Sequence, residues 1–321
     1  MFSRAARFRC KILDARIGPA RLRPVTRAKS PGAVTPAPPK VVRLKTPRPE
    51  SHRASRPPPK RGARPSVRPA PPEALERRSS ASSPEECLSR AMVAATARAR
   101  GIWARRGLAA RSRIDKTTHA MLLRQLYLAH FEQRQFREAV QVVEQSLPLG
   151  ILADVLHQDA ARAAFALGDV DRAARHLRTA ARVGPASRRA FHWWTLGSLF
   201  YLSGRYRDAV GALSRAARWG VRDKPLYEAH LAVARCANGE RVTGLGRMLR
   251  KLAEVPAGQG YGRFVLGLLA FHHNRTVDAR AHLEAFLQRT SERPAVALIA
   301  LDGECRHAET LLATLSRVNA H

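Results

Sequence analysis

Residues 190–216 read AFHWWTLGSLFYLSGRYRDAVGALSRA and hold two apolar series separated by a turn at Gly204. The first series is Trp193, Leu196, Gly197 and Phe200, and the second is Tyr206, Ala209, Leu213 and Ala216. Intervals of three and four residues place most members of each series on one face of a helix. The stretch therefore predicts two helices joined by a tight turn, that is, a helix hairpin.

The second helix of this hairpin has counterparts along the chain, each marked by a small residue. These residues are Ala139, Ala173, Ala209, Gly244 and Ala279, with spacings of 34, 36, 35 and 35 residues. A larger apolar residue follows each of them four positions later, at Val143, Leu177, Leu213, Met248 and Leu283. A small side chain lets two helices approach closely, and the larger one fills the space beside it. Five stacked helix hairpins are therefore predicted.

Each predicted hairpin has a turn residue between its two helices. The turn residues are Arg134, Gly168, Gly204, Gly239 and Asn274. Glycine and asparagine tolerate a left-handed backbone, so Arg134 is a departure from the pattern. We expect repeat four to be the weakest, because Gly244 and Gly246 within its second helix would each cost about 1 kcal/mol relative to alanine.

A shorter unit, from Pro294 to Leu315, follows the fifth repeat. Its small residue, Ala308, lies only 29 residues after Ala279. Repeat arrays need an end piece whose outer face tolerates water, a role that suits Asp302, Glu304, Arg306 and Glu309. We therefore expect a C-terminal capping hairpin, which completes an all-α solenoid over residues 120–316.

The pattern WxxLGxxF, followed by a turn glycine and a small alanine, resembles the tetratricopeptide repeat. Here it is formed by Trp193, Leu196, Gly197 and Phe200, with Gly204 and Ala209 after them. That motif is a hairpin of about 34 residues that needs stacked copies beside it. The resemblance implies a right-handed superhelix whose concave groove, lined by the first helix of each repeat, holds a peptide or helix from a partner protein. The family's carboxylate clamp is absent, because its positions hold Arg124, Leu128, Asp159, Phe191 and Thr195.

An aromatic row runs along the predicted groove, near the end of the first helix of four repeats, with Cys236 in the fourth repeat. The partner-groove candidates are Arg124, Phe131, Arg162, Phe165, Trp194, Ser198, Tyr201, Tyr261, Phe264 and Phe271. Aromatic anchors dominate the binding energy of desolvated interfaces. The alternative is that these side chains pack between repeats. Of the two adjacent tryptophans, we expect Trp193 to face the core and Trp194 to face the partner.

Residues 1–82 form a region rich in Arg, Pro and Ala. Residues 1–80 carry 21 Arg and Lys against four acidic residues. Repulsion between like charges and the scarcity of bulky apolar groups predict disorder. Such a basic arm either contacts polyanions without specificity or is a solvated tail. Residues 1–24, which are Arg-rich with interspersed apolar residues, give organelle targeting as an alternative to a cytoplasmic location.

Ordered structure is expected to begin at Ser83, a potential N-cap followed by Pro84, Glu85 and Glu86. We expect a single N-terminal helix over residues 83–113 that packs against the array. The alternative is a polyanion-binding surface formed by its many arginines.

The charge, the cysteine positions and the lengths of the apolar runs argue for some classes of protein and against others. The chain of 321 residues has a net charge of +32, and 49 of its 57 basic residues are Arg, a bias that a GC-rich genome also produces. The four cysteines lie too far apart for a zinc or redox motif. No run approaches the 18 or so apolar residues of a membrane span. These features favour a cytoplasmic protein without a membrane segment or disulfide framework.

We expect no catalytic activity, cofactor or metal. The sequence holds no nucleophile elbow or zinc-protease helix, and the GQGYG run at 258–262 lacks the preceding strand of a phosphate-binding loop. The predicted function is a non-catalytic scaffold or adaptor that binds a partner protein. The alternative is a nucleic-acid-associated helical-repeat protein acting through its basic arm. Pentatricopeptide repeats, with a period near 35 and a base-reading code, match the WxxLGxxF pattern less closely.

Overall fold

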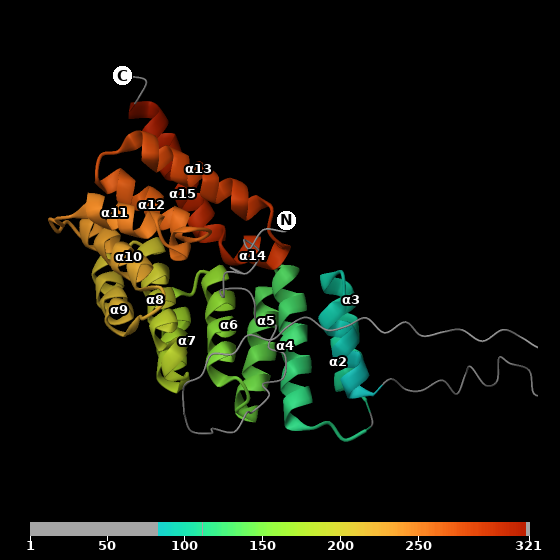
Figure 1. Ribbon diagram of the computed structural model, residues 1–321. Helices are drawn as coiled ribbons and strands as arrows, with labels where there is room; N and C mark the ends of the chain where they lie inside the picture. The colour runs from blue at the N-terminus through green and yellow to red at the C-terminus, as the bar shows by residue number, and fades with distance from the viewer. Residues whose placement is uncertain (1–82, 111, 319–321) are drawn as a thin grey trace, which may run out of the picture. The chain divides into compact units, whose positions relative to one another are not determined.

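The computed structural model describes residues 83–110 and 112–318 (Figure 1). Within this range the structure consists of helices and connecting segments, without a β-strand. The all-α prediction is confirmed. The predictions of a disordered basic arm at 1–82 and of a targeting segment at 1–24 fall outside the described residues.

The described part begins with two helices, α2 (Pro84–Val93) and α3 (Ala97–Leu108), which pack against each other. The Ser83 hydroxyl caps α2 by accepting a hydrogen bond from the Glu86 amide at 3.1 Å. The predicted single helix over 83–113 is wrong, because Thr96 starts a new helix by accepting from the Ala99 amide at 3.1 Å. The region is therefore one more helix pair at the N-terminal end of the array.

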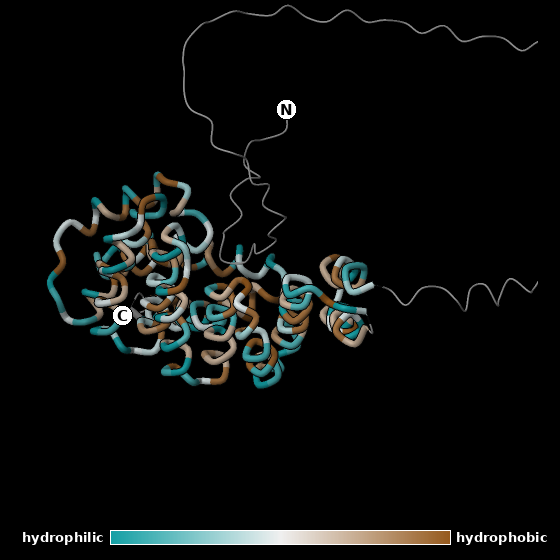
Figure 2. The backbone as a smooth tube through the Cα atoms, turned by 90° about the horizontal axis from the view of Figure 1, so that it is seen from below, coloured by the Kyte–Doolittle hydropathy of each residue, from teal (hydrophilic) through white to brown (hydrophobic). Residues whose placement is uncertain are grey.

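Five helix pairs follow, as the repeat spacing predicts. They are α4 (Lys116–Glu132) and α5 (Phe136–Ser146), α6 (Ala153–Ala166) and α7 (Val170–Val183), α8 (Ala186–Leu202) and α9 (Tyr206–Trp219), α10 (Lys224–Ala237) and α11 (Leu245–Ala253), and α12 (Gly262–His272) and α13 (Thr276–Ser291). Two short 3₁₀ helices, η2 (Leu147–Leu149) and η3 (Pro256–Gly258), lie in connections between pairs. Helices adjacent in sequence pack side by side from α2 to α13, which makes the array an α-solenoid (Figure 1). Hydrophobic and hydrophilic residues alternate along these helices, as expected where each helix buries only part of its surface (Figure 2).

The five predicted turn residues all have a left-handed backbone. Their φ angles are 57° at Arg134, 82° at Gly168, 72° at Gly204, 82° at Gly239 and 56° at Asn274. Each of them ends the first helix of a repeat and redirects the chain into the second. At Arg134 the array accepts a non-glycine residue in a conformation that costs about 1 kcal/mol or more.

The small residues fit the second helices against the first as expected, with one exception. Ala139, Ala173, Ala209 and Ala279 are completely buried. The first helices contribute close approaches of their own, since a Cβ added at Gly197 would lie 2.4 Å from Leu213 Cγ. We call these contacts between the two helices of a repeat the hairpin seam.

The exception is repeat four, where the predicted placement of Gly244 within a helix is wrong. Gly244 precedes α11 and has a left-handed backbone with φ 77°. The helix is only nine residues long and is buried instead through Leu245, Leu249 and Leu252. Gly244 therefore begins the helix and does not weaken its interior.

The C-terminal unit comprises α14 (Ala295–Ala300) and α15 (Asp302–Val318). Helix α15 packs on α13, as expected for an end piece, but it also contacts α8. Helix α14 contacts α4 in the first repeat, beside which it lies in Figure 1. The unit thus returns to the first of the five repeats, which the repeat pattern did not predict.

Candidate partner-binding site

The C-terminal unit packs on most of the aromatic side chains predicted to line the groove. We call this surface the inner wall, made of Phe165 from α6, Trp194, Ser198 and Tyr201 from α8, and Tyr261 and Phe264 from the start of α12. Ala300, Leu301 and Glu304 line the same pocket as four of these residues, Phe165, Trp194, Ser198 and Tyr261. The structure thus brings these six groove candidates together, against a segment of the same chain.

The expected roles of the two adjacent tryptophans are wrong. Trp194 is only 3% exposed, whereas Trp193 is half-buried. The Trp193 ring lies 6.1 Å from that of Trp219 and carries the Arg215 guanidinium 4.7 Å from its centroid. Trp194 thus belongs to the interior, and Trp193 lies nearer the surface.

Trp194 anchors the centre of the inner wall through directed contacts. Its indole Nε1 donates a hydrogen bond to His230 Nδ1 at 3.1 Å, and its ring meets Tyr261 edge-to-face at 4.7 Å. Burial, with a smaller contribution from His307, lowers the pKa of His230 to about 3. His230 is therefore neutral near pH 7, and accepting through Nδ1 places its proton on Nε2. These contacts fix the ring of Trp194 in one orientation.

Glu304 at the start of α15 places a carboxyl group on the inner wall. Its Oε1 accepts hydrogen bonds from the Tyr261 hydroxyl at 3.2 Å and the Ser198 hydroxyl at 3.4 Å, and the two hydroxyls lie 2.7 Å apart. Glu304 forms no ion pair with any described residue. Burial raises the pKa of this carboxyl to about 7.

The residues around Glu304 complete the contact between the C-terminal unit and the inner wall. The His307 ring lies 5.4 Å from Tyr201 and 6.0 Å from Phe264. A Cβ at Gly303 would be 3.3 Å from Leu202 and 3.5 Å from Phe165. The close fit at Gly303 shows that α15 begins directly against the ends of α6 and α8.

Helix α14 extends this contact toward the first repeat. Its Val296, Ile299 and Ala300 pack against the apolar cluster that contains Phe131. Phe131 is buried, so the aromatic candidate from repeat one also lies beneath protein atoms. Phe271, the remaining aromatic candidate, is half-buried at the end of α12.

The two basic groove candidates bind a buried carboxylate of the array. Arg124 Nε donates to Asp159 Oδ2 at 3.1 Å, and Arg162 donates to Asp159 Oδ1 at 2.9 Å. The Tyr127 hydroxyl donates to the Asp159 carbonyl oxygen at 2.9 Å. Asp159 is completely buried, and the pairs satisfy both of its oxygens. Arg124 thereby links repeats one and two, and whether either arginine contacts a partner stays a prediction.

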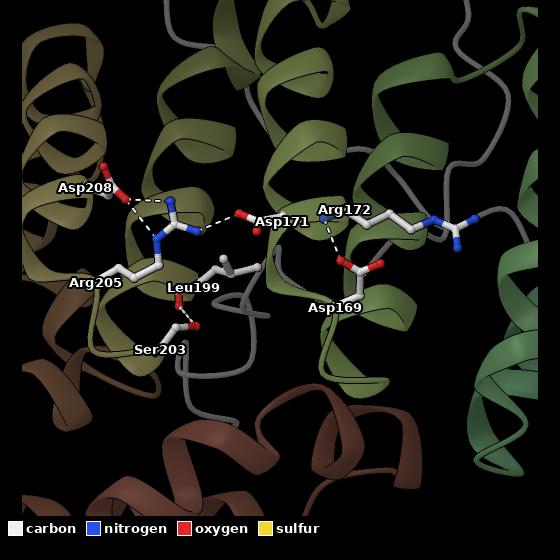
Figure 3. A network of polar contacts seen from close by, with 7 residues as sticks. All are labelled: Asp169, Asp171, Arg172, Leu199, Ser203, Arg205 and Asp208. Carbon is white, nitrogen blue, oxygen red and sulfur yellow. Dashed lines mark hydrogen bonds and ion pairs between the residues drawn. The ribbon is translucent and has the colours of Figure 1, made fainter.

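A different network joins repeats two and three near their turns (Figure 3). Arg205 donates to Asp171 of the preceding repeat at 2.7 Å and to Asp208 of its own repeat at 2.8 Å. All three side chains are substantially exposed, so this network contributes little to stability.

The described residues include no group of three or more His, Cys, Asp or Glu side chains placed to hold a metal ion. In the same part of the chain, each helix is too short or too polar to cross a bilayer. No family model matches the chain, and no curated protein matches it.

The expectation that Glu304 lies on the water-facing side of the end piece is wrong, because its side chain is buried against Ser198 and Tyr261. The sequence did not indicate the role of His307 or the return of α14 to the first repeat. The available signals were the shortened spacing of 29 residues before Ala308 and the change at Asp302 from the apolar run of 295–301 to a polar one. Neither signal identifies which distant surface the segment covers.

Proposed function

We propose that this protein is a non-catalytic interaction scaffold that holds a helical segment of a partner protein against the inner wall. The main support for the proposal is that α14 and the start of α15 pack on the first helices of repeats one, two, three and five. The covering residue Glu304 lies 43 positions after Tyr261 and 106 positions after Ser198 in the chain, and packing of such a distant segment on the inner wall supports the proposal that a helix from another chain binds there.

The second candidate is a nucleic-acid-associated protein, and the charge of the chain favours it. Residues 81–321 carry 36 basic and 21 acidic residues, in addition to the excess in residues 1–80. A basic surface attracts any polyanion, an acidic protein as well as a nucleic acid.

Of the two locations that the sequence allows, the cytoplasm and an organelle, we propose the cytoplasm.

Affinity capture from a lysate with the full-length chain tests these alternatives. The scaffold proposal expects specific protein partners that persist after nuclease treatment. It also expects capture to increase for Ile299→Asp, because a charge in α14 weakens its seat on the first repeat. Leu298→Asp is the matched control, since Leu298 is in the same helix but 37% exposed.

Two results would contradict the scaffold proposal. Loss of all captured proteins after nuclease treatment would favour the nucleic-acid candidate. Equal capture by the wild type, Ile299→Asp and Leu298→Asp, with no specific protein in any, would leave the inner wall without a binding role.

A further inference from the structure

We propose that the pocket between α6, α8 and the C-terminal unit binds a small alkylamine, whose ammonium group donates to the Oε2 atom of Glu304. The ligand enters beside the covering segment, so α14 and α15 stay in place. The inference does not depend on the scaffold proposal. Three observations support it: the size and lining of the pocket, the carboxyl group of Glu304 and the aromatic rings around that group.

The pocket limits the ligand to a short chain of atoms. Its volume is about 80 Å³, and most of the residues that line it are apolar. A cavity of about 150 Å³ holds benzene, so this pocket suits a short alkyl chain better than a ring. It opens to solvent past lining residues that are only partly buried, namely Arg162, Phe165, Thr195, Leu202 and Ala300.

The carboxyl group of Glu304 supplies an acceptor for the ligand. Its Oε1 accepts from the Tyr261 and Ser198 hydroxyls, whereas its Oε2 forms no hydrogen bond with another described residue. The residue as a whole is only 8% exposed, but Oε2 is not sealed from solvent. Glu304 thus keeps one oxygen against the inner wall and has the other available to the pocket that it lines. A buried carboxylate is stabilised by a cation that also donates a hydrogen bond to it.

The charges near this carboxyl group favour a cation over an anion. Burial, with a smaller contribution from Asp302, raises the pKa of Glu304 to about 7, as expected for a carboxyl group without a cationic partner. Arg162 is the one basic side chain among the described residues that line the pocket, and it already donates to Asp159 at 2.9 Å. Burial also lowers the pKa values of His307 and His230, so both are neutral near pH 7. An ammonium group therefore adds the charge that Glu304 lacks.

Aromatic rings suit the rest of the ligand. Trp194 and Tyr261 meet edge-to-face with ring centroids 4.7 Å apart, and both line the pocket together with Phe165. Aromatic faces attract an ammonium group, and their apolar surface packs against an alkyl chain. The Ser198 hydroxyl oxygen, which also lines the pocket, offers a second acceptor to the three N–H groups of the ammonium. A neutral alcohol or a carboxylate of the same length lacks this combination of charge and donors.

The experiment titrates the full-length, nitrogen-15-labelled chain with n-butylamine and follows the indole N–H signals of its tryptophans by nuclear magnetic resonance. Trp194 lines the pocket, whereas Trp103 in α3 does not and is the internal control. n-Butanol and butyrate are matched probes with a neutral and a negative head group. Glu304→Gln removes the charge while keeping the shape, and Glu309→Gln makes the same change on an exposed residue of α15. Circular dichroism checks that each variant is folded.

The proposal expects n-butylamine to shift the Trp194 signal saturably and to leave Trp103 unchanged. n-Butanol should bind about tenfold more weakly, and butyrate should not bind. Glu304→Gln should weaken binding of n-butylamine about tenfold and abolish its preference over n-butanol, whereas Glu309→Gln should change neither. Because n-butylamine stays cationic while Glu304 ionises, its affinity for the wild type should rise from pH 6 to pH 8, and its affinity for Glu304→Gln should not.

Several results would overturn the proposal: no response of Trp194 to n-butylamine, equal binding of n-butylamine and n-butanol, full affinity in Glu304→Gln, or equal shifts of Trp103 and Trp194. The second would leave only an apolar cavity, and the last would make the binding nonspecific. The preference among the three probes is measured on the wild type, so it decides the question even if Glu304→Gln does not fold. Capture of proteins from a lysate is a separate measurement, so failure here leaves the scaffold proposal standing.

Discussion

The hairpin seam and the inner wall are both buried, but they are built from different chemistry. At the seam, small and large apolar side chains interlock, as Gly197 does with Leu213, between helices that are neighbours in sequence. At the inner wall, Trp194, Ser198 and Tyr261 bring polar atoms to a surface that is covered by a distant segment. Apolar contacts such as that of Gly197 with Leu213 need only a matching shape, whereas buried polar groups also need partners. The inner wall therefore needs a covering segment that supplies partners for its polar atoms.

The largest effect should come from removing a ring at the inner wall. Phe264→Ala leaves a cavity next to Phe286 and His307, since Phe264 is completely buried. We expect a loss of about 4 kcal/mol in the free energy of unfolding, measured by urea denaturation. The half-buried Phe271 provides the control, and Phe271→Ala should cost clearly less. Equal losses would mean that the inner wall is no better packed than the end of the helix.

At the seam, adding volume should be nearly as damaging. In Gly197→Val the new Cβ would lie 2.4 Å from Leu213 Cγ, so α8 and α9 must move apart. The expected loss is about 3 kcal/mol. The control is Gly211→Ala in α9, where the nearest atom to the new Cβ is the end of Arg215 at 4.0 Å, and alanine should stabilise by about 0.5–1 kcal/mol. A melting temperature that does not fall in Gly197→Val would show that the seam tolerates separation.

The stability of the inner wall should depend on pH through the Glu304 carboxyl, in the opposite sense to the seam histidines His157 and His176, whose pKa values burial lowers. The pKa of Glu304 is raised to about 7 in the folded chain, from an ordinary value of 4.5. Between these values the folded state binds more protons, so the free energy of unfolding should fall as pH rises from 4.5 to 7 and level off above. The contribution is at most about 3 kcal/mol, and smaller if α15 opens locally.

Glu304→Gln should remove that contribution, so the difference in unfolding free energy between wild type and variant measures it across pH 5 to 8. The comparison with the variant is needed because His230, whose pKa is lowered to about 3, acts in the opposite direction below its ordinary value of 6.5. An identical pH dependence in both proteins would contradict the burial of the Glu304 carboxyl.

The smallest effect is expected at the exposed network of Figure 3. Arg205→Ala removes its ion pairs with Asp171 and Asp208, which water surrounds, and should cost less than about 1 kcal/mol. The small loss should disappear at high salt concentration, which thermal unfolding at two ionic strengths would reveal. A salt-independent loss would assign Arg205 a packing role.

Local sequence patterns were sufficient to predict the hairpin seam. The spacing of Ala139, Ala173, Ala209 and Ala279 located the second helices, and the turn residues, Asn274 included, have the expected backbone. Both signals are local, because a helix face and a left-handed turn are determined within a few residues. The break near Thr96 was missed because its flanking alanines favour helix on either side.

The inner wall could be predicted only in part. Periodicity identified the face of α8 that carries Trp194, Ser198 and Tyr201, but it could not show what covers that face. The covering residues, such as Glu304, lie more than 100 positions later in the chain. Contacts at that separation leave no periodic signal in a single sequence, so exposure to a partner and burial under α15 gave the same pattern.

The contact between α14 and α4 closes repeats one to five and the C-terminal unit into a ring, with the α2–α3 pair outside it. In an open solenoid each repeat interacts only with its neighbours, so the ends fray independently and folding spreads from any starting point. Here repeat one and the C-terminal unit must unfold together or lose their mutual contact first. Closure should thus sharpen the unfolding transition and slow folding, because residues far apart in sequence must meet before the ring is complete.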